Sequence, residues 1–197
     1  MILNTIEKAM MNNPIRALLQ RHFEARRLLG MGGPMSGGLA LEVGCGRGVG
    51  AEIILDRFGA ERLEAFDLDE RQVAIARRRL AKYSEKVKLW RGSVTEIPAD
   101  DDHYDAVFDF AIVHHVPDWR NAVREIHRVL KPGARFYCEE VLKHFIHRPT
   151  WRRLLDHPMQ DRFSHSEFLD ELRNTGFEII AEQRFAQDLG WSVSAKT

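Results

Sequence analysis

Leu41-Glu42-Val43-Gly44-Cys45-Gly46-Arg47-Gly48 is the stretch of sequence that decides the fold. It joins an apolar run that begins at Leu39 to an amphipathic segment that begins at Ala51. Glycines in such a turn let the backbone bend sharply and come close to a ligand that side chains would block. A glycine-rich turn between a strand and a helix therefore predicts a ligand-binding βα unit at this point.

The chain after this turn alternates short apolar runs with amphipathic segments. Helices are expected over residues 51–58, 70–83, 119–130 and 164–175, and strands over 39–43, 63–66, 87–90, 106–110, 134–141, 177–185 and 189–195. Strands that alternate with helices pair in parallel through right-handed crossovers. We therefore expect an α/β fold: a doubly wound, Rossmann-like sheet of seven strands flanked by helices. The sheet should be mostly parallel, with one antiparallel strand from the last hairpin.

Two segments lie outside this alternation. Residues 1–36 are predicted to form an N-terminal helical leader or cap, in which the apolar residues recur at helical spacing: Ile15, Leu18, Leu19, Phe23 and Leu28. Pro14 is a suitable first helical residue after Asn13. Residues 37–197 form the main domain, with a helical insertion at about 142–163. Both extra segments are expected to cover the carboxyl ends of the strands, where ligands bind in such sheets.

Composition narrows the class of protein. The 197 residues carry 29 Lys plus Arg and 29 Asp plus Glu, and this zero net charge argues against a dedicated nucleic-acid binder. The two cysteines, Cys45 and Cys138, lack CxxC spacing, so neither a disulfide framework nor a metal site is expected. No apolar run approaches the roughly 18 residues of a membrane span. We expect a soluble, cytoplasmic protein, and the sequence does not indicate its oligomeric state.

The chemistry around the glycine turn favours one kind of ligand. Asp67 ends the next predicted strand, about 20 residues after the glycines, where a carboxylate can accept ribose hydroxyls. A pyrophosphate site needs Gly-x-Gly-x-x-Gly, but the glycines here fall at 44, 46, 48 and 50. Glu42 would repel a phosphate and suits a cationic amino group. A nicotinamide-dependent Rossmann oxidoreductase therefore remains an alternative that the glycine spacing disfavours.

Several blocks in sequence order resemble the class I S-adenosylmethionine-dependent methyltransferases, type 11 subgroup. They run unbroken from about residue 39 to 141: Glu42-Val43-Gly44-Cys45-Gly46-Arg47-Gly48, Ala65-Phe66-Asp67-Leu68-Asp69, Gly92-Ser93-Val94, Ile97-Pro98, Tyr104-Asp105-Ala106-Val107-Phe108, Val113-His114-His115-Val116 and Arg128-Val129-Leu130-Lys131-Pro132-Gly133. The resemblance implies a class I methyltransferase domain over residues 37–197. It also implies S-adenosylmethionine as cofactor and S-adenosylhomocysteine as product.

The resemblance also implies roles for particular residues. Those expected to bind the methionine portion and the sulfonium are Glu42, Gly44, Cys45, Gly46, Asp109 and Phe110. Those expected to bind the ribose and adenine are Asp67, Leu68, Ser93 and Val94. Ser93 departs from the Asp that the family usually carries at this position, so its bond to the adenine amino group lacks charge assistance.

The function implied is methyl transfer to a small-molecule acceptor that the sequence does not identify. A base is needed only when the acceptor arrives protonated. Candidates for this role are His114, His115, Glu139 and Glu140. A nucleophilic role for Cys45 is disfavoured, because the family often has a small residue there. A non-catalytic protein that only binds S-adenosylmethionine is the remaining alternative, because the fold fixes no catalytic residue.

Overall fold

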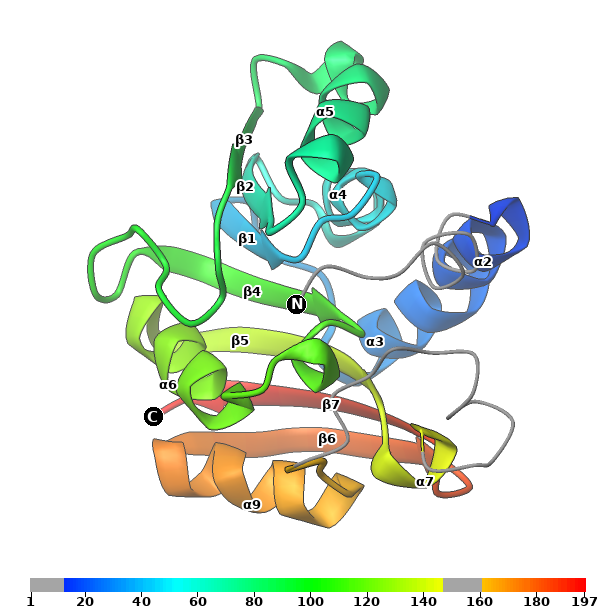
Figure 1. The fold of residues 1–197 in the computed structure, drawn as a ribbon. Coiled ribbons are helices and arrows are strands. Elements are labelled where there is room, and N and C mark those ends of the chain that lie inside the picture. The colour runs from blue at the N-terminus through cyan, green and yellow to red at the C-terminus, as the bar shows by residue number, and fades with distance from the viewer. Residues whose placement is uncertain (1–12, 147–160) are drawn as a thin grey trace.

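The computed structural model describes residues 13–146 and 161–197. It contains one seven-stranded sheet with the strand order β3-β2-β1-β4-β5-β7-β6 (Figure 1). The strands are β1 (Leu39–Val43), β2 (Arg62–Asp67), β3 (Val87–Arg91), β4 (Tyr104–Phe110), β5 (Leu130–Val141), β6 (Phe177–Phe185) and β7 (Leu189–Lys196). Only β7 runs antiparallel to its neighbours, β5 and β6. The predicted seven-stranded doubly wound sheet with one antiparallel strand is therefore confirmed.

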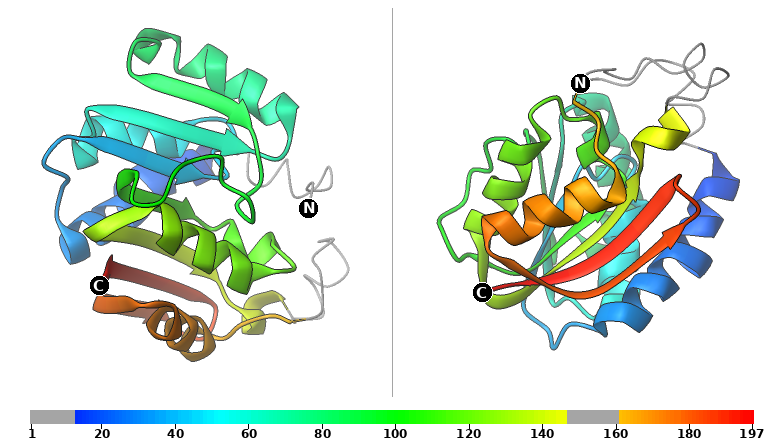
Figure 2. Two further views of the ribbon diagram at one scale, coloured as in Figure 1. Left: turned by 90° about the vertical axis from the view of Figure 1, so that its left-hand side faces the viewer. Right: turned by 90° about the horizontal axis from the view of Figure 1, so that it is seen from below.

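Helices cover both faces of the sheet (Figure 2). The first face is covered by α2 (Pro14–Leu19), η1 (Gln20–Glu24), α3 (Ala25–Gly32), α4 (Val49–Ile53), η2 (Ile54–Phe58), α5 (Glu70–Arg79) and η3 (Ala81–Tyr83). The second face and the strand ends carry η4 (Val113–His115), α6 (Trp119–Val129), α7 (Lys143–Ile146) and α9 (His165–Thr175). Each face has its own apolar core, because successive strand residues point to opposite sides. Phe108 and Tyr137 stack in the first core, and Trp119 and Phe163 pack in the second.

The start of β5 differs from the predicted strand over 134–141. Helix α6 ends at Val129 and β5 begins directly at Leu130, which pairs with Tyr104 of β4. The next aligned pair is Ala106 with Arg135, so the intervening residues of β5 form a bulge. Proline and glycine in the bulge predict a turn from the sequence, although the strand continues through them.

Residues 14–32 form one continuous helix, called here the leader helix, from α2, η1 and α3. It begins as predicted after Asn13, whose side-chain oxygen accepts a hydrogen bond from the backbone N–H of Ile15 at 2.9 Å. Of the apolar residues whose spacing predicted this helix, only Leu28 is buried. The predicted insertion at about 142–163 falls largely on residues 147–160, outside the described residues.

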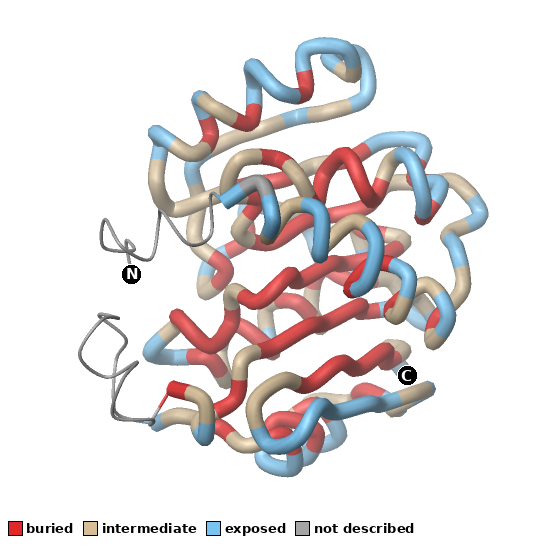
Figure 3. The backbone as a smooth tube through the Cα atoms, turned by 90° about the vertical axis from the view of Figure 1, so that its right-hand side faces the viewer, coloured by how far each residue is buried: buried red, intermediate tan, exposed pale blue. Residues whose placement is uncertain are grey.

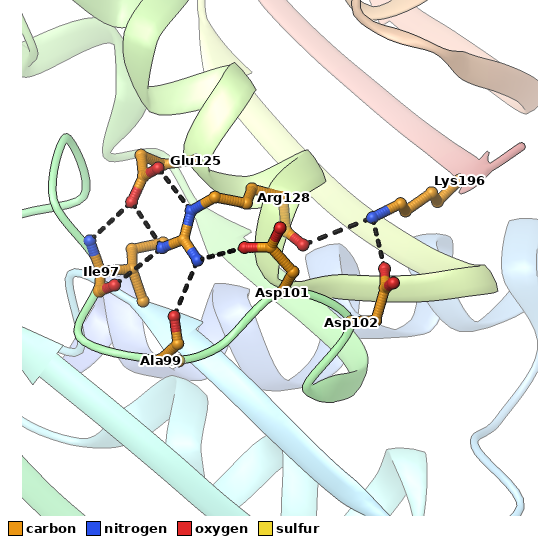
Figure 4. Close-up of polar contacts among 7 residues, drawn as sticks. All are labelled: Ile97, Ala99, Asp101, Asp102, Glu125, Arg128 and Lys196. Atoms are coloured by element: carbon orange, nitrogen blue, oxygen red, sulfur yellow. Dashed lines mark hydrogen bonds and ion pairs between the residues drawn. The ribbon is translucent and has the colours of Figure 1, made fainter.

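Arg128 of α6 makes most of the contacts drawn between this helix and the segment that joins β3 to β4 (Figure 4). The Arg128 guanidinium donates to the backbone carbonyls of Ile97 and Ala99 at 2.9 and 2.7 Å. It also donates to the carboxylates of Glu125 and Asp101 at 2.7–2.9 Å. This segment begins just after β3 and lines the cavity described below, so Arg128 fixes part of the candidate site from a distance.

Candidate functional site

A cavity of about 620 Å³ opens at the carboxyl ends of the strands. Its walls come from the turns that follow β1, β2, β3 and β4, and from the leader helix. β1 lies between β2 and β4, where the strand order of the sheet reverses. Ligands of open α/β sheets bind at such a reversal, outside the carboxyl ends of the strands. The volume is typical of a site for a small organic molecule.

The glycine turn after β1 forms the floor of this cavity. Gly44, Gly46 and Gly48 all have positive φ angles, of 68°, 49° and 78°. Any other residue would strain the backbone in these conformations. A side chain at Gly44 would also collide with Ile112, since an added Cβ would lie 2.3 Å from it. The sequence of the turn therefore brings bare backbone to the cavity wall, as predicted from its glycines.

Asp67 stands beside the glycine turn at the end of β2. One carboxylate oxygen accepts a hydrogen bond from the backbone N–H of Gly46 at 2.9 Å, and the other accepts from the N–H of Asp69 at 2.8 Å. A carboxylate offers about four acceptor sites, so it can accept further hydrogen bonds. Asp67 and its neighbour Leu68 line the cavity.

Glu42 is a buried carboxyl group on the cavity wall. Its side chain is 2% exposed, and among the described residues nothing hydrogen-bonds its Oε2 atom. Burial, with added repulsion from Asp67 and Asp109, raises the pKa of Glu42 well above its usual value. A buried carboxyl oxygen without a donor is costly, and a cationic amino group in the cavity would satisfy it.

The far end of the cavity carries two hydroxyl groups. Ser93 and Thr95 line it, and their side-chain oxygens lie 2.8 Å apart in a hydrogen bond. Ser93 Oγ also accepts from the backbone N–H of Thr95 at 3.3 Å. Val94 lies between them in the same wall. Thr95 was not among the residues predicted from the sequence, and the short Ser-x-Thr spacing was the available signal.

Cys45 lines the cavity but is not set up as a nucleophile. Burial, followed by the nearby carboxylates of Glu42 and Asp67, raises the pKa of its thiol well above the usual value. A reactive cysteine needs the opposite shift, because the thiolate is the nucleophile. Cys45 therefore supplies backbone and a small side chain to the glycine turn.

Phe110 and Asp109 end β4 on opposite faces. Phe110 lines the cavity, whereas Asp109 is fully buried and does not line it. Asp109 instead accepts hydrogen bonds from the backbone N–H of Ile112 at 2.9 Å and from the Cys138 thiol at 3.4 Å. Alternation along the strand explains the separation, since consecutive side chains point to opposite sides. The structure thus places only one of these two predicted cofactor residues at the cavity.

The four candidate bases occupy different surroundings. His115 lines the cavity, and its ring lies against that of His114, tilted by 39° with 4.0 Å between centroids. His114 lies behind it and pairs through Nδ1 with Glu140 at 2.5 Å. Glu140 also accepts from the backbone N–H of Val113 at 2.7 Å. Burial raises the pKa of Glu140 to about 7.

Glu139 points to the other face of the sheet, toward the leader helix. Its Oε1 atom lies 3.4 Å from the Arg16 guanidinium, which also pairs with Glu24. Glu139, Glu140 and His114 do not line the cavity, so of the four candidates only His115 is exposed to a ligand there.

The leader helix contributes residues that sequence reasoning missed. Arg16, Ala17 and Gln20 line the cavity, together with Asn13 just before the helix. The glycine turn and these residues are separated by more than twenty positions, and no local pattern links them. The only sequence feature that could have indicated these residues is the spacing of Arg16 and Gln20, which are four residues apart on one helix face.

In the described part of the chain, no helix combines the length and the apolar character that crossing a bilayer requires.

Comparison with known proteins agrees with this geometry. A family profile described as a methyltransferase domain matches residues 41–138, which run from β1 to β5. A probable S-adenosylmethionine-dependent methyltransferase of Mycolicibacterium smegmatis is 33% identical over 143 residues, covering 71% of this chain and 51% of the relative. A demethylmenaquinone methyltransferase of Staphylococcus epidermidis is 30% identical over 105 residues, covering 53% of this chain and 43% of the relative. The chain thus spans about half the length of the curated relatives it matches.

A solved structure shows the same fold. A SAM-dependent methyltransferase from Aquifex aeolicus superimposes with a TM-score of 0.76 at 20% identity, covering 97% of both chains. The profile match, the relatives and the fold agree with the glycine turn, the carboxylate after β2 and the cavity between them. The chain belongs to the class I S-adenosylmethionine-dependent methyltransferases, in the type 11 subgroup.

Proposed function

We propose that this protein transfers the methyl group of S-adenosylmethionine to a small-molecule acceptor. The observation that carries the proposal is the shared cavity wall, where the glycine turn, Asp67 and the unsatisfied carboxyl group of Glu42 meet. When bound, the cofactor supplies a sulfonium whose methyl group is already activated. The protein then has to bind the cofactor and the acceptor, orient them toward each other and exclude water. Alignment of the acceptor atom with the methyl group and the sulfur can supply much of the rate acceleration.

The cofactor-binding roles follow from the chemistry of the wall. Glu42 would accept the amino group of the methionine portion, and Asp67 would accept the ribose hydroxyls beside Gly46. Leu68 would pack against the adenine. The hydroxyl pair of Ser93 and Thr95 would lie at the adenine edge, in place of the carboxylate that the family usually carries.

The acceptor would enter between the leader helix and η4. The cavity wall there has the apolar residues Ala17, Ile112 and Val116 beside the charged Arg16, and His115 stands among them. We propose an apolar small molecule with one ionisable oxygen or nitrogen, from which His115 takes the proton as the methyl group arrives. The relative named as a demethylmenaquinone methyltransferase supports a lipophilic ring compound as the first acceptor to try.

The test has two stages. Calorimetry should show binding of S-adenosylmethionine and none of NAD; the reverse result would identify an oxidoreductase. Release of S-adenosylhomocysteine is then measured with a demethylated quinol, a sterol, a phenol and a secondary amine. If the protein binds S-adenosylmethionine but releases no S-adenosylhomocysteine with any of these acceptor classes, it is a protein that only holds the cofactor.

A further inference from the structure

The inner face of the leader helix is charged. Arg16 pairs with Glu24 of the same helix and with Glu139 of β5. Arg21 pairs with Glu52 of α4, which is buried. A surface helix normally turns its apolar side to the protein and its charges to water. Over its first turns, the leader helix does the reverse.

The outer face of the same helix is apolar. Four large side chains are between 51% and 65% exposed: Ile15, Leu18, Leu19 and Phe23. Leu18 and Leu19 follow Ile15 by three and four positions, and Phe23 follows Leu19 by four, so they form one stripe along the helix, called here the outer stripe. Figure 3 shows this side of the molecule, with the exposed positions of the leader helix facing the viewer. Nothing in the described residues covers the outer stripe fully.

Basic residues accompany the outer stripe. Arg26 is exposed, and its helical spacing places it on the same side as Leu18 and Leu19. The Arg27 guanidinium lies 4.6 Å from the ring centroid of Phe23, at the edge of the stripe. Glu24 is the one acidic residue between positions 14 and 32, and it faces inward toward Arg16. The outer face of the helix is therefore both apolar and cationic.

We propose that the outer stripe docks on a membrane surface that carries anionic headgroups. Interfacial helices combine bulky apolar residues, which enter the acyl boundary, with basic residues that meet the headgroups. Phe23 and Leu19 would enter the boundary, and Arg26 and Arg27 would lie at headgroup level. Charge complementarity therefore selects an anionic lipid surface.

A second copy of the chain fits the outer stripe less well. In a two-fold contact both copies present the same stripe, and the one acidic residue of its helix, Glu24, faces inward, so Arg26 would find no carboxylate on the other copy's stripe. The stripe from position 15 to 23 is about 12 Å long, whereas a stable interface uses about 20–30 residues on each side.

Docking would also have a consequence for the cavity. Ala17 and Gln20, on the inner face of the helix, line the cavity wall. The helix that meets the membrane is thus the one that borders the acceptor side of the cavity. This inference goes beyond methyl transfer, because surface binding needs neither cofactor nor acceptor.

The experiment is co-sedimentation of the full chain with vesicles. Vesicles of phosphatidylcholine plus phosphatidylglycerol are compared with phosphatidylcholine alone, and the wild type should bind the anionic ones more strongly. The double variant Leu18→Gln/Leu19→Gln should lower the partition coefficient about tenfold or more, because it removes apolar surface from the boundary. Arg26→Glu should lower binding to the anionic vesicles selectively.

The matched control is Ile180→Gln/Phe185→Gln, which changes two exposed apolar side chains on β6, 46% and 64% exposed. It should bind vesicles as the wild type does. All four substituted apolar side chains are exposed, so thermal melts should stay near that of the wild type. Equal vesicle binding by the Leu18→Gln/Leu19→Gln variant, or none by the wild type, overturns the proposal. Sedimentation velocity showing a dimer that this variant abolishes, without vesicle binding, assigns the stripe to a second copy.

Discussion

Asp67 accepts a hydrogen bond from the backbone N–H of Gly46, with 2.9 Å between Oδ2 and the nitrogen. Its other oxygen accepts from Asp69, the N-cap residue of α5, at 2.8 Å. A single side chain at the end of β2 therefore ties the glycine turn after β1 to the start of the next helix. The carboxylate assigned to the ribose also holds the shape of the turn beside it.

Asp67→Ala should weaken binding of S-adenosylmethionine by about 1–3 kcal/mol, the usual cost of losing a charged hydrogen-bond partner. Titration calorimetry measures the loss. Asp170→Ala is the matched control, since Asp170 is an exposed carboxylate on α9. A folded Asp67→Ala protein with unchanged affinity would contradict the placement of the ribose. Thermal melts show whether the glycine turn also loses stability.

Glu42 should make cofactor binding depend on pH. Burial raises its pKa well above the usual value in the ligand-free protein, so much of it is protonated at low pH. A cationic amino group binds the ionised form better, so affinity should rise as the pH rises through the raised pKa. Glu42→Gln should bind more weakly and with a flatter pH profile. A Glu42→Gln profile parallel to the wild-type profile would remove Glu42 from the amino-group site.

His115→Ala should distinguish the acceptor side of the cavity from the cofactor side. If His115 faces the acceptor, affinity for S-adenosylmethionine should stay within about twofold, while kcat with a protonated acceptor falls about 10²–10⁴-fold. The loss should be smaller at high pH, where the acceptor ionises without a base. Calorimetry together with a pH-rate profile checks both effects, and a large loss of cofactor affinity would move His115 to the cofactor side.

Much of the fold follows from local patterns in the sequence. The alternation of apolar runs with amphipathic segments gives the strands and their parallel pairing. Ser164 and Glu167 predict a capping box, and both of its hydrogen bonds are present at the start of α9. Gly176 ends the same helix with a φ of 106°, in the left-handed region that favours glycine. These features depend on residues a few positions apart, which is why the sequence reveals them.

Other features depend on contacts that no local pattern carries. Whether Asp109 or Phe110 faces the cavity is set by which side of β4 the leader helix and α4 cover. Leu18 and Leu19 face outward on a helix whose inner side makes ion pairs, Arg16 with β5 and Arg21 with α4. Helical spacing alone identifies a stripe without saying which side it faces.

Arg128 should matter for stability more than for chemistry. It donates three hydrogen bonds of 2.7–2.9 Å to the segment after β3 and two more to Glu125 within α6. Arg128→Ala should lower the free energy of unfolding by about 2–3 kcal/mol, since two backbone carbonyls and two carboxylates lose a charged donor. Arg124→Ala is the control, because Arg124 lies on the same helix and its one ion pair, with Glu171, is 3.9 Å long.

Urea denaturation measures both Arg128→Ala and Arg124→Ala. The Arg124→Ala change should stay within about 0.5 kcal/mol, as expected for an exposed site. A similar small change for Arg128→Ala would show that water replaces the lost donor without cost. Arg128→Ala should lower cofactor affinity only through displacement of Ser93 and Thr95, which lie on the segment that Arg128 holds.

Glu140 should make the ligand-free fold less stable as the pH rises. Burial raises its pKa to about 7, and the unfolded chain has a pKa of about 4.3 for Glu. Between these values the folded state binds more protons than the unfolded state, so the free energy of unfolding falls with increasing pH. The difference between wild type and Glu140→Gln should therefore shrink by about 3 kcal/mol from pH 4.3 to pH 7 and stay constant outside this window.

Denaturation by urea across this pH range measures the Glu140 effect. Glu178→Gln, at an exposed position of β6, should follow the wild type at every pH. A constant difference between wild type and Glu140→Gln would mean that Glu140 is ionised in the fold throughout the range. In that case its pair with His114 would be a carboxylate that accepts a hydrogen bond from the imidazole Nδ1–H.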